Sequence, residues 1–134
     1  MGWRTVRDIE AWNHSMKLQS EFFAVLDRSP ANTDRRFCDD ARDAVASAAR
    51  NIAEGFGRYG DAEFAKFVNI AIGSLTETYT NLVIATDRRY ISAEESQRLL
   101  ALCGEAQATT VGLMKMLKAR IENKKRQRLA ARRR

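Results

Sequence analysis

Three glycines (Gly55, Gly57 and Gly60) fall within six positions, between two long stretches of helical pattern. Glycine reaches positive φ without steric cost, so a cluster of this kind ends a helix and builds the turn after it. Asp61 follows at once, and its side-chain oxygen is suited to cap the next helix, with Glu63 in the first turn. The segment therefore predicts a hinge between two helices.

Two helices are predicted before this turn, at residues 8–28 and 33–55. The apolar stripe of the first consists of Ile9, Trp12, Met16, Phe23 and Leu26, widened by Leu18, Phe22 and Val25. Ser29-Pro30 ends it, because a residue before proline is pushed out of the α region. Asn32 or Thr33 is expected to cap the second helix, with Asp34 in its first turn. The face of the second helix is largely alanine, so its neighbours should approach closely.

Two further helices are predicted after the turn, at residues 61–87 and 92–121. The third is apolar around so much of its circumference that it should be central in a bundle or shared with another subunit. Gly73 and Ser74 in its middle suggest close contact with a neighbouring helix. Ser92 and Glu95 form a capping box at the start of the fourth helix. Residues 1–7 are a short lead-in, and residues 122–134 are expected to be a frayed helix or disordered.

Four amphipathic helices with short connectors predict an all-α fold, an antiparallel up-down-up-down four-helix bundle with a basic C-terminal tail. No strand pattern competes with this interpretation. The chain has 134 residues, which is enough for a single domain with a substantial core.

Positive charge is concentrated at the end of the chain. The net charge is +6, yet residues 115–134 alone carry +9 and the remainder carries −3. Such asymmetry predicts an extension that contacts nucleic-acid phosphates without sequence specificity; the alternative is a solubilising terminus. Few exposed aromatic residues accompany the charges, so base stacking is not predicted. The candidate nucleic-acid-binding residues are Lys115, Lys118, Arg120, Lys124, Lys125, Arg126, Arg128, Arg132, Arg133 and Arg134.

Catalytic residues, metal ligands and cofactor sites are not predicted. The single histidine, His14, has no carboxylate at a helical spacing that suggests a ligand pair, and the acidic cluster Asp39, Asp40 and Asp43 is interpreted as a solvated face. Cys38 and Cys103 lie far apart and are expected to be reduced and partly buried. No apolar run approaches the roughly 18 residues of a membrane span, and a cytoplasmic location is expected.

Arg58 lies between two predicted helix ends. We interpret it structurally, as a bridge to the carboxylate of Glu54, Glu63 or Glu77 that fixes the turn. The alternative is that Arg58 binds an anion together with the amides at the start of the third helix. A phosphate cradle of the P-loop type is excluded, because no lysine follows the glycines at the required place and no strand precedes them.

Residues 49–58 (ARNIAEGFGR), 63–67 (EFAKF) and 70–77 (IAIGSLTE) together resemble the signature of the 23S rRNA intervening-sequence protein family, also called four helix bundle proteins. The resemblance extends over residues 6–118. The chain departs from the pattern in lacking the proline often found before Asn51, and its arginine-rich tail is not part of the signature. The motif residues, which we interpret as structural, are Asn51, Glu54, Gly55, Gly57, Arg58, Glu63, Phe64, Phe67, Gly73, Ser74, Leu75 and Glu77.

The resemblance implies an antiparallel bundle that assembles into a homopentamer and has no enzymatic activity. Relatives include the accessory variability protein of diversity-generating retroelements, which binds a reverse transcriptase and RNA through a basic surface. We therefore expect a non-enzymatic, pentameric protein that binds RNA or DNA through its basic end or serves as a scaffold. The alternative is an accessory subunit of a reverse transcriptase, or another protein-interaction module.

Overall fold

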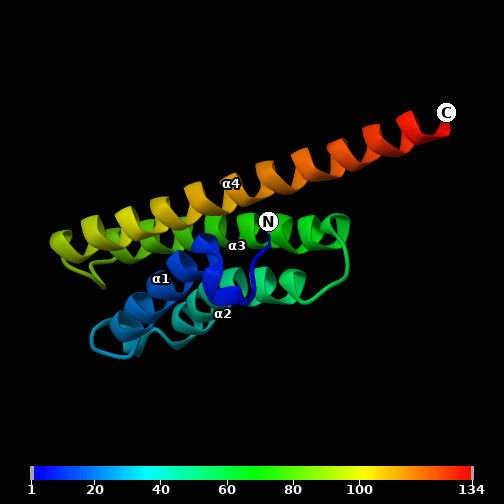
Figure 1. The fold of residues 1–134 in the computed structure, drawn as a ribbon. Helices are drawn as coiled ribbons and strands as arrows, with labels where there is room; N and C mark the ends of the chain where they lie inside the picture. Colours follow the sequence, from blue (N-terminus) through cyan, green and yellow to red (C-terminus); the bar gives the residue numbers. More distant parts are fainter. Residues whose placement is uncertain (1, 134) are drawn as a thin grey trace.

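Four long helices make up the computed structural model, which describes residues 2–133 (Figure 1). They are α1 (Glu10–Leu26), α2 (Arg35–Phe56), α3 (Asp61–Asp87) and α4 (Ala93–Arg132). Two short 3-10 turns, η1 (Val6–Asp8) and η2 (Ala31–Thr33), precede α1 and α2. Each helix packs against the next along the chain, and α1 also packs against α4. The predicted up-down four-helix bundle is thereby confirmed.

The core consists of two groups of buried side chains. The first group joins all four helices and includes Phe22, Leu75 and Leu99, all of them fully buried. The other lies near the α2–α3 turn and includes Ile52 and Leu117. No helix among residues 2–133 is long and apolar enough to cross a membrane.

The register of α1 differs from the predicted stripe. Met16 is 37% exposed, and Trp12 and Phe23 are only half-buried. The face toward the core instead carries residues spaced by three and four that include two small ones: Ala11, Ser15, Leu18, Phe22 and Val25. Small residues on this face let α1 approach its neighbours closely, and a ranking by hydrophobicity alone overlooks them.

The start of α2 also differs from prediction. Asn32 and Thr33 lie in η2, and Asp34 is the capping residue, accepting a hydrogen bond from the Phe37 amide at 3.2 Å. Tyr90, from the α3–α4 connector, donates its hydroxyl to the other carboxylate oxygen of Asp34 at 2.5 Å. The Tyr90 hydrogen bond, and secondarily that of Phe37, lowers the pKa of the Asp34 carboxyl. The predicted capping box of Ser92 and Glu95 is confirmed at the start of α4.

The two small residues in the middle of α3 have different surroundings. Ser74 is buried and donates to the Ser47 hydroxyl on α2 at 2.7 Å, as expected for close helix contact. Gly73 is exposed, and a Cβ built on it would meet nothing within 4 Å in this chain. The predicted close contact at Gly73 is therefore wrong within one subunit, because this residue faces away from the core.

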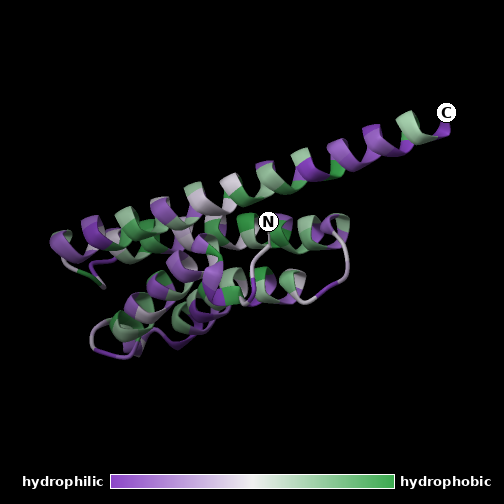
Figure 2. Cartoon of the chain, viewed as in Figure 1, coloured by the Kyte–Doolittle hydropathy of each residue, from purple (hydrophilic) through white to green (hydrophobic). Residues whose placement is uncertain are grey.

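Helix α4 continues to Arg132, well past the expected end at residue 121 (Figure 1). Residues 122–132 contain no glycine or proline, and most of them are strong helix formers. This segment is exposed throughout, and Figure 2 shows it as mostly hydrophilic. The helix thus projects beyond the α2–α3 turn at the same end of the bundle.

Both cysteines are free and buried, Cys103 completely so. Burial raises the pKa of both thiols, that of Cys103 to about 11. A raised pKa keeps a thiol protonated and unreactive at neutral pH. The two cysteines therefore contribute to packing.

Candidate nucleic-acid interface

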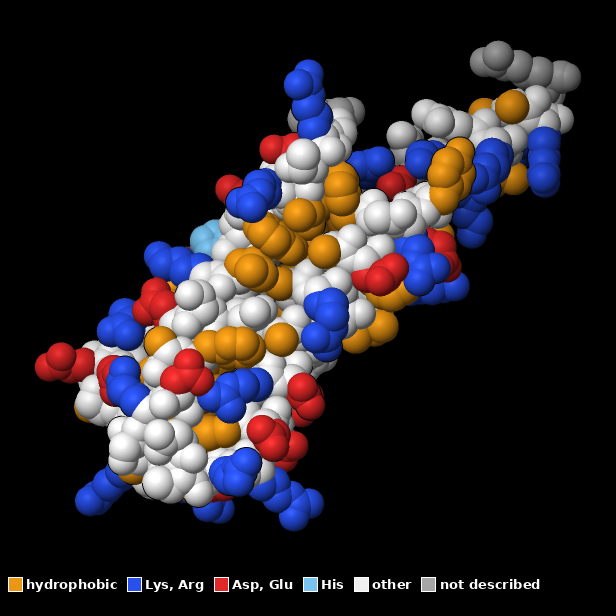
Figure 3. All heavy atoms as spheres, turned by 90° about the horizontal axis from the view of Figure 1, so that it is seen from below, with side chains coloured by type: hydrophobic (Ala, Val, Ile, Leu, Met, Phe, Trp, Pro, Cys, Tyr) orange, Lys and Arg blue, Asp and Glu red, His pale blue; other side chains and the backbone are white. Residues whose placement is uncertain are grey.

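The core-facing stripe of α4 becomes basic where the helix leaves the bundle. Leu113 and Leu117 are buried. The following positions on that face, at spacings of three and four, are Arg120, Lys124 and Arg128. Figure 3 shows Lys and Arg side chains gathered over the projecting end of the helix. The projection thus turns a cationic face toward the α2–α3 turn.

Asp61 holds this part of α4 against the start of α3. Its carboxylate contacts Arg120 at 3.1 Å and Lys124 at 2.9 Å, and its side chain is only 11% exposed. The Arg120 guanidinium also lies 5.9 Å from the centre of the Trp3 ring. Asp61 was predicted to cap α3, but Gly60 is the capping residue and the Asp61 side chain makes no capping hydrogen bond. Its partners lie about sixty residues away, so local sequence could not indicate them.

The other candidate basic residues lie along the exposed surface of α4. Lys115 and Lys118 are on the part of the helix within the bundle, and Lys125, Arg126, Arg128, Arg132 and Arg133 are on the projection. Arg134 lies outside the described residues. Within residues 2–133, ion pairs involve only Arg120 and Lys124 of the candidate set. The exposed cations that form none are Lys115, Lys118, Lys125, Arg126, Arg128, Arg132 and Arg133.

Arg58 makes its contacts at the end of α2 and with α3. It pairs with Glu54 at 3.0 Å, and its guanidinium lies 5.0 Å from the centre of the Phe67 ring. Glu63 pairs instead with Lys66 at 2.9 Å, so the predicted bridge goes to Glu54 alone. Arg58 and Arg120 line one small hollow of about 190 Å³, and the Asp61 carboxylate lines it as well. Asp61 thus supplies a negative charge at the N-terminus of α3.

The remaining motif residues differ in what they contact. Asn51 donates to the Ser47 carbonyl at 2.8 Å and to its hydroxyl at 2.9 Å. Phe64 and Leu75 are buried, and Phe67 is half-buried. Glu77 is exposed and makes no ion pair with a residue that the structure describes. Asn51, Phe64, Phe67 and Leu75 thus make contacts within the bundle, whereas Glu77 faces solvent.

Tyr59, which is not among the predicted site residues, is 99% exposed at the tip of the α2–α3 turn. It borders a hollow of about 410 Å³ between this turn and the projecting part of α4. The hollow is also lined by Ile121, Lys124, Lys125 and Arg128. Few exposed aromatic residues were expected beside the charges, and Tyr59 is one at this end of the molecule. The position of Tyr59 between Gly57 and Gly60, within a glycine-rich turn, was the signal that could have indicated an exposed side chain.

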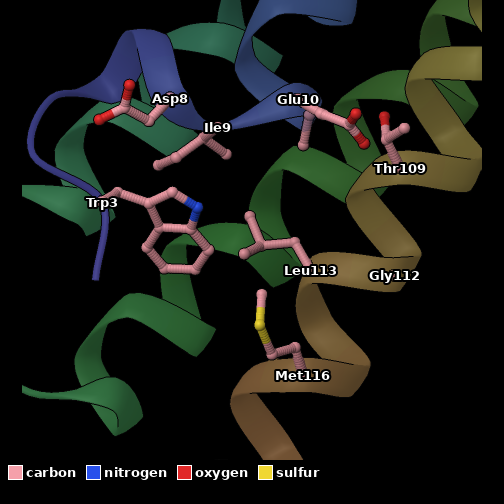
Figure 4. Close-up of a pocket in the computed structure, with 9 residues that line it drawn as sticks. Trp3, Asp8, Ile9, Glu10, Thr109, Gly112, Leu113 and Met116 are labelled. Carbon is pink, nitrogen blue, oxygen red and sulfur yellow. The ribbon is translucent and has the colours of Figure 1, made fainter. Parts of the chain in front are cut away.

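Another hollow, of about 450 Å³, separates the N-terminal segment from α4 (Figure 4). Trp3, Leu113 and Met116 point into it, so much of its lining is apolar. The Asp8 carboxylate accepts hydrogen bonds from the Arg4 and Thr5 amides, at 2.8 and 3.0 Å. These bonds, chiefly that of Thr5, lower the pKa of Asp8. The Asp8 carboxylate in this hollow is thus engaged in capping η1.

His14 does have an acidic partner, Glu105 on α4, at 3.3 Å. Both side chains are partly exposed, so they form a surface pair between α1 and α4. No group of three or more His, Cys, Asp or Glu side chains within residues 2–133 is arranged to hold a metal ion.

A family model described as 23S rRNA-intervening sequence protein matches residues 7–112. The match covers all of α1, α2 and α3 and about half of α4, and it ends before most of the basic residues at the end of the chain. No curated protein matches the sequence.

Proposed function

The chain belongs to the 23S rRNA-intervening sequence protein family, and we propose that it is a homo-oligomeric protein that binds nucleic acid through the projecting end of α4. The observation that carries this proposal is the exposed cationic end of α4 at residues 122–132, with several cations that form no ion pair with a described residue. Exposed Lys and Arg side chains neutralise nucleic-acid phosphates, and this releases the counterions condensed on the nucleic acid. The interaction is electrostatic and tolerant of sequence.

Removing residues 122–134 tests this proposal. We expect the chain ending at Ile121 to bind a fluorescein-labelled RNA of about 20 nucleotides at least tenfold more weakly, near 0.1 M salt, because most unpaired cations are lost. Fluorescence anisotropy over a salt series measures both affinity and the salt slope. A matched control keeps the helix and its length and replaces Lys125, Arg126, Arg128, Arg132 and Arg133 with glutamine. It should lose affinity as the truncation does. Unchanged affinity in both variants, or a flat salt dependence of the intact protein, would contradict the proposal.

The oligomer that we propose is a closed ring, for which the family resemblance suggests five subunits. Two separate flanks of α3 carry exposed apolar side chains. Tyr79 and Val83, 46% and 37% exposed, are four residues apart and share one flank. Ile70, 49% exposed, is rotated from Val83 by about 140° around the helix axis. Two different patches on one subunit suit a head-to-tail interface, the kind from which closed rings are built, whereas a two-fold dimer needs one self-complementary patch.

Light scattering of the purified protein should give about five times the chain mass of 15.2 kDa. Ile70→Glu and Val83→Glu should each dissociate the ring, because each charge disrupts one side of every interface. Mixing the two variants leaves one intact interface between an Ile70 side and a Val83 side, so the mixture should form heterodimers. Circular dichroism should show unchanged helix content in both variants. A monomeric parent protein, or a mixture that stays monomeric, would contradict the ring.

A further inference from the structure

The strongest unexplained feature of the surface is Tyr59. A tyrosine side chain that is 99% exposed buries almost none of its ring, so packing of this chain does not account for it. It projects from a turn whose Gly60 has φ of 92°, a conformation that favours glycine. Within residues 2–133, no hydrogen bond or ring-to-ring contact involves Tyr59.

The hollow beside Tyr59 has the composition of a site for a flat apolar group linked to negative charge. Ile121 and Ala62 contribute apolar lining, and Lys124, Lys125 and Arg128 contribute charge. Its volume of about 410 Å³ is in the range of small-ligand sites. Aromatic rings next to a cationic groove are the elements from which single-strand binding surfaces are built.

The charge balance of this hollow favours an anion. The single acidic residue in its lining, Asp61, is already neutralised by Arg120 and Lys124. Lys125 and Arg128 form no ion pair with a described residue, and their positions on successive turns of α4 place two positive charges along one side of the hollow. A polyanion that passes along α4 therefore meets unpaired cations and, across the hollow, an exposed ring.

We propose that Tyr59 stacks on an unpaired base of single-stranded nucleic acid, while Lys125 and Arg128 contact the adjoining phosphates. This proposal rests on the proposed nucleic-acid binding and adds to it the preferred ligand, a single strand. A base in a duplex is stacked on both faces and offers no free surface to Tyr59. The site consequently favours single strands over duplexes, with little dependence on sequence, because every base presents a flat face.

The test uses the full chain and two labelled RNAs of equal length, a single-stranded oligouridine and a perfect duplex. Tyr59→Ala should weaken binding of the single strand by about tenfold and leave the salt slope unchanged, since no charge is removed. Tyr59→Phe keeps the ring and should bind like the parent protein. Affinity for the duplex should be the same for all three proteins. An abasic single strand should bind the parent protein and Tyr59→Ala equally.

The outcomes separate this proposal from the one on which it rests. If the parent protein binds both RNAs with a normal salt dependence and Tyr59→Ala binds the single strand equally well, the stacking proposal is overturned and nucleic-acid binding stands. If Tyr59→Ala weakens binding of the single strand, the duplex and the abasic strand alike, Tyr59 supports the surface generally and the stacking proposal also fails. If the parent protein binds neither RNA, nucleic-acid binding itself fails and stacking fails with it.

Discussion

Replacing Gly55 with alanine should destabilise the protein by about 2 kcal/mol, because α3 leaves no room for a side chain there. A Cβ at this position would lie 2.7 Å from Cδ1 of Phe64 and 2.8 Å from Cβ of Phe67. It would also lie 3.1 Å from the Phe64 carbonyl oxygen, so a side-chain rotation cannot relieve the crowding. The gain in helix propensity, about 1 kcal/mol, offsets only part of this cost.

Gly57→Ala is the matched control, two residues further along the same turn. A Cβ there would meet its nearest atoms at 3.6 and 3.7 Å, and the backbone φ is −77°, which alanine adopts without strain. This variant should be neutral or more stable by up to about 1 kcal/mol. Chemical denaturation of both variants at one protein concentration measures the difference. Equal stability of the two would mean that α2 and α3 are further apart than the structure places them.

The glycine-rich turn illustrates how far sequence could predict this fold. The turn itself was predictable, because glycine clusters and helical periodicity are local signals. The separate roles of the three glycines could not be predicted from the sequence. Gly60 alone has positive φ, Gly55 is required by the approach of α3, and Gly57 has an ordinary helical conformation. Only the packing of one helix on the next distinguishes them.

The basic residues of the candidate site were predictable as a list but not as an arrangement, and Tyr59 was missed. Composition identified the basic residues, since charge can be counted without a structure. The segment was expected to fray because it buries little, and α4 instead continues through it. Only a continuous helix brings Lys124 and Arg128 beside Tyr59, across a separation of more than sixty residues in sequence. Long-range proximity of this kind leaves no periodic signal.

The rotation of α1 about its axis decides which of two neighbouring phenylalanines is buried in the core, and this choice should have a large effect on stability. The sequence pattern gave Phe23 a central place and Phe22 a flanking one. In the structure Phe22 is fully buried among residues such as Leu18 and Leu75, whereas Phe23 is half-buried with the Arg42 guanidinium 6.0 Å from its ring centre. Both residues are phenylalanine, adjacent and on one helix, so a comparison of their alanine variants isolates the effect of burial.

Phe22→Ala should lower the free energy of unfolding by about 3–5 kcal/mol, because it removes a fully buried ring and leaves a cavity. Phe23→Ala should cost about 1–2 kcal/mol, since part of its ring already contacts water. Both variants should be unfolded by denaturant at the same protein concentration, because the stability of an oligomer depends on concentration. Phe22→Leu should recover part of the loss by refilling the cavity. If Phe23→Ala cost more than Phe22→Ala, the helix would be rotated about its axis toward the register that the sequence pattern favoured, and the small residues Ala11 and Ser15 would no longer face the core.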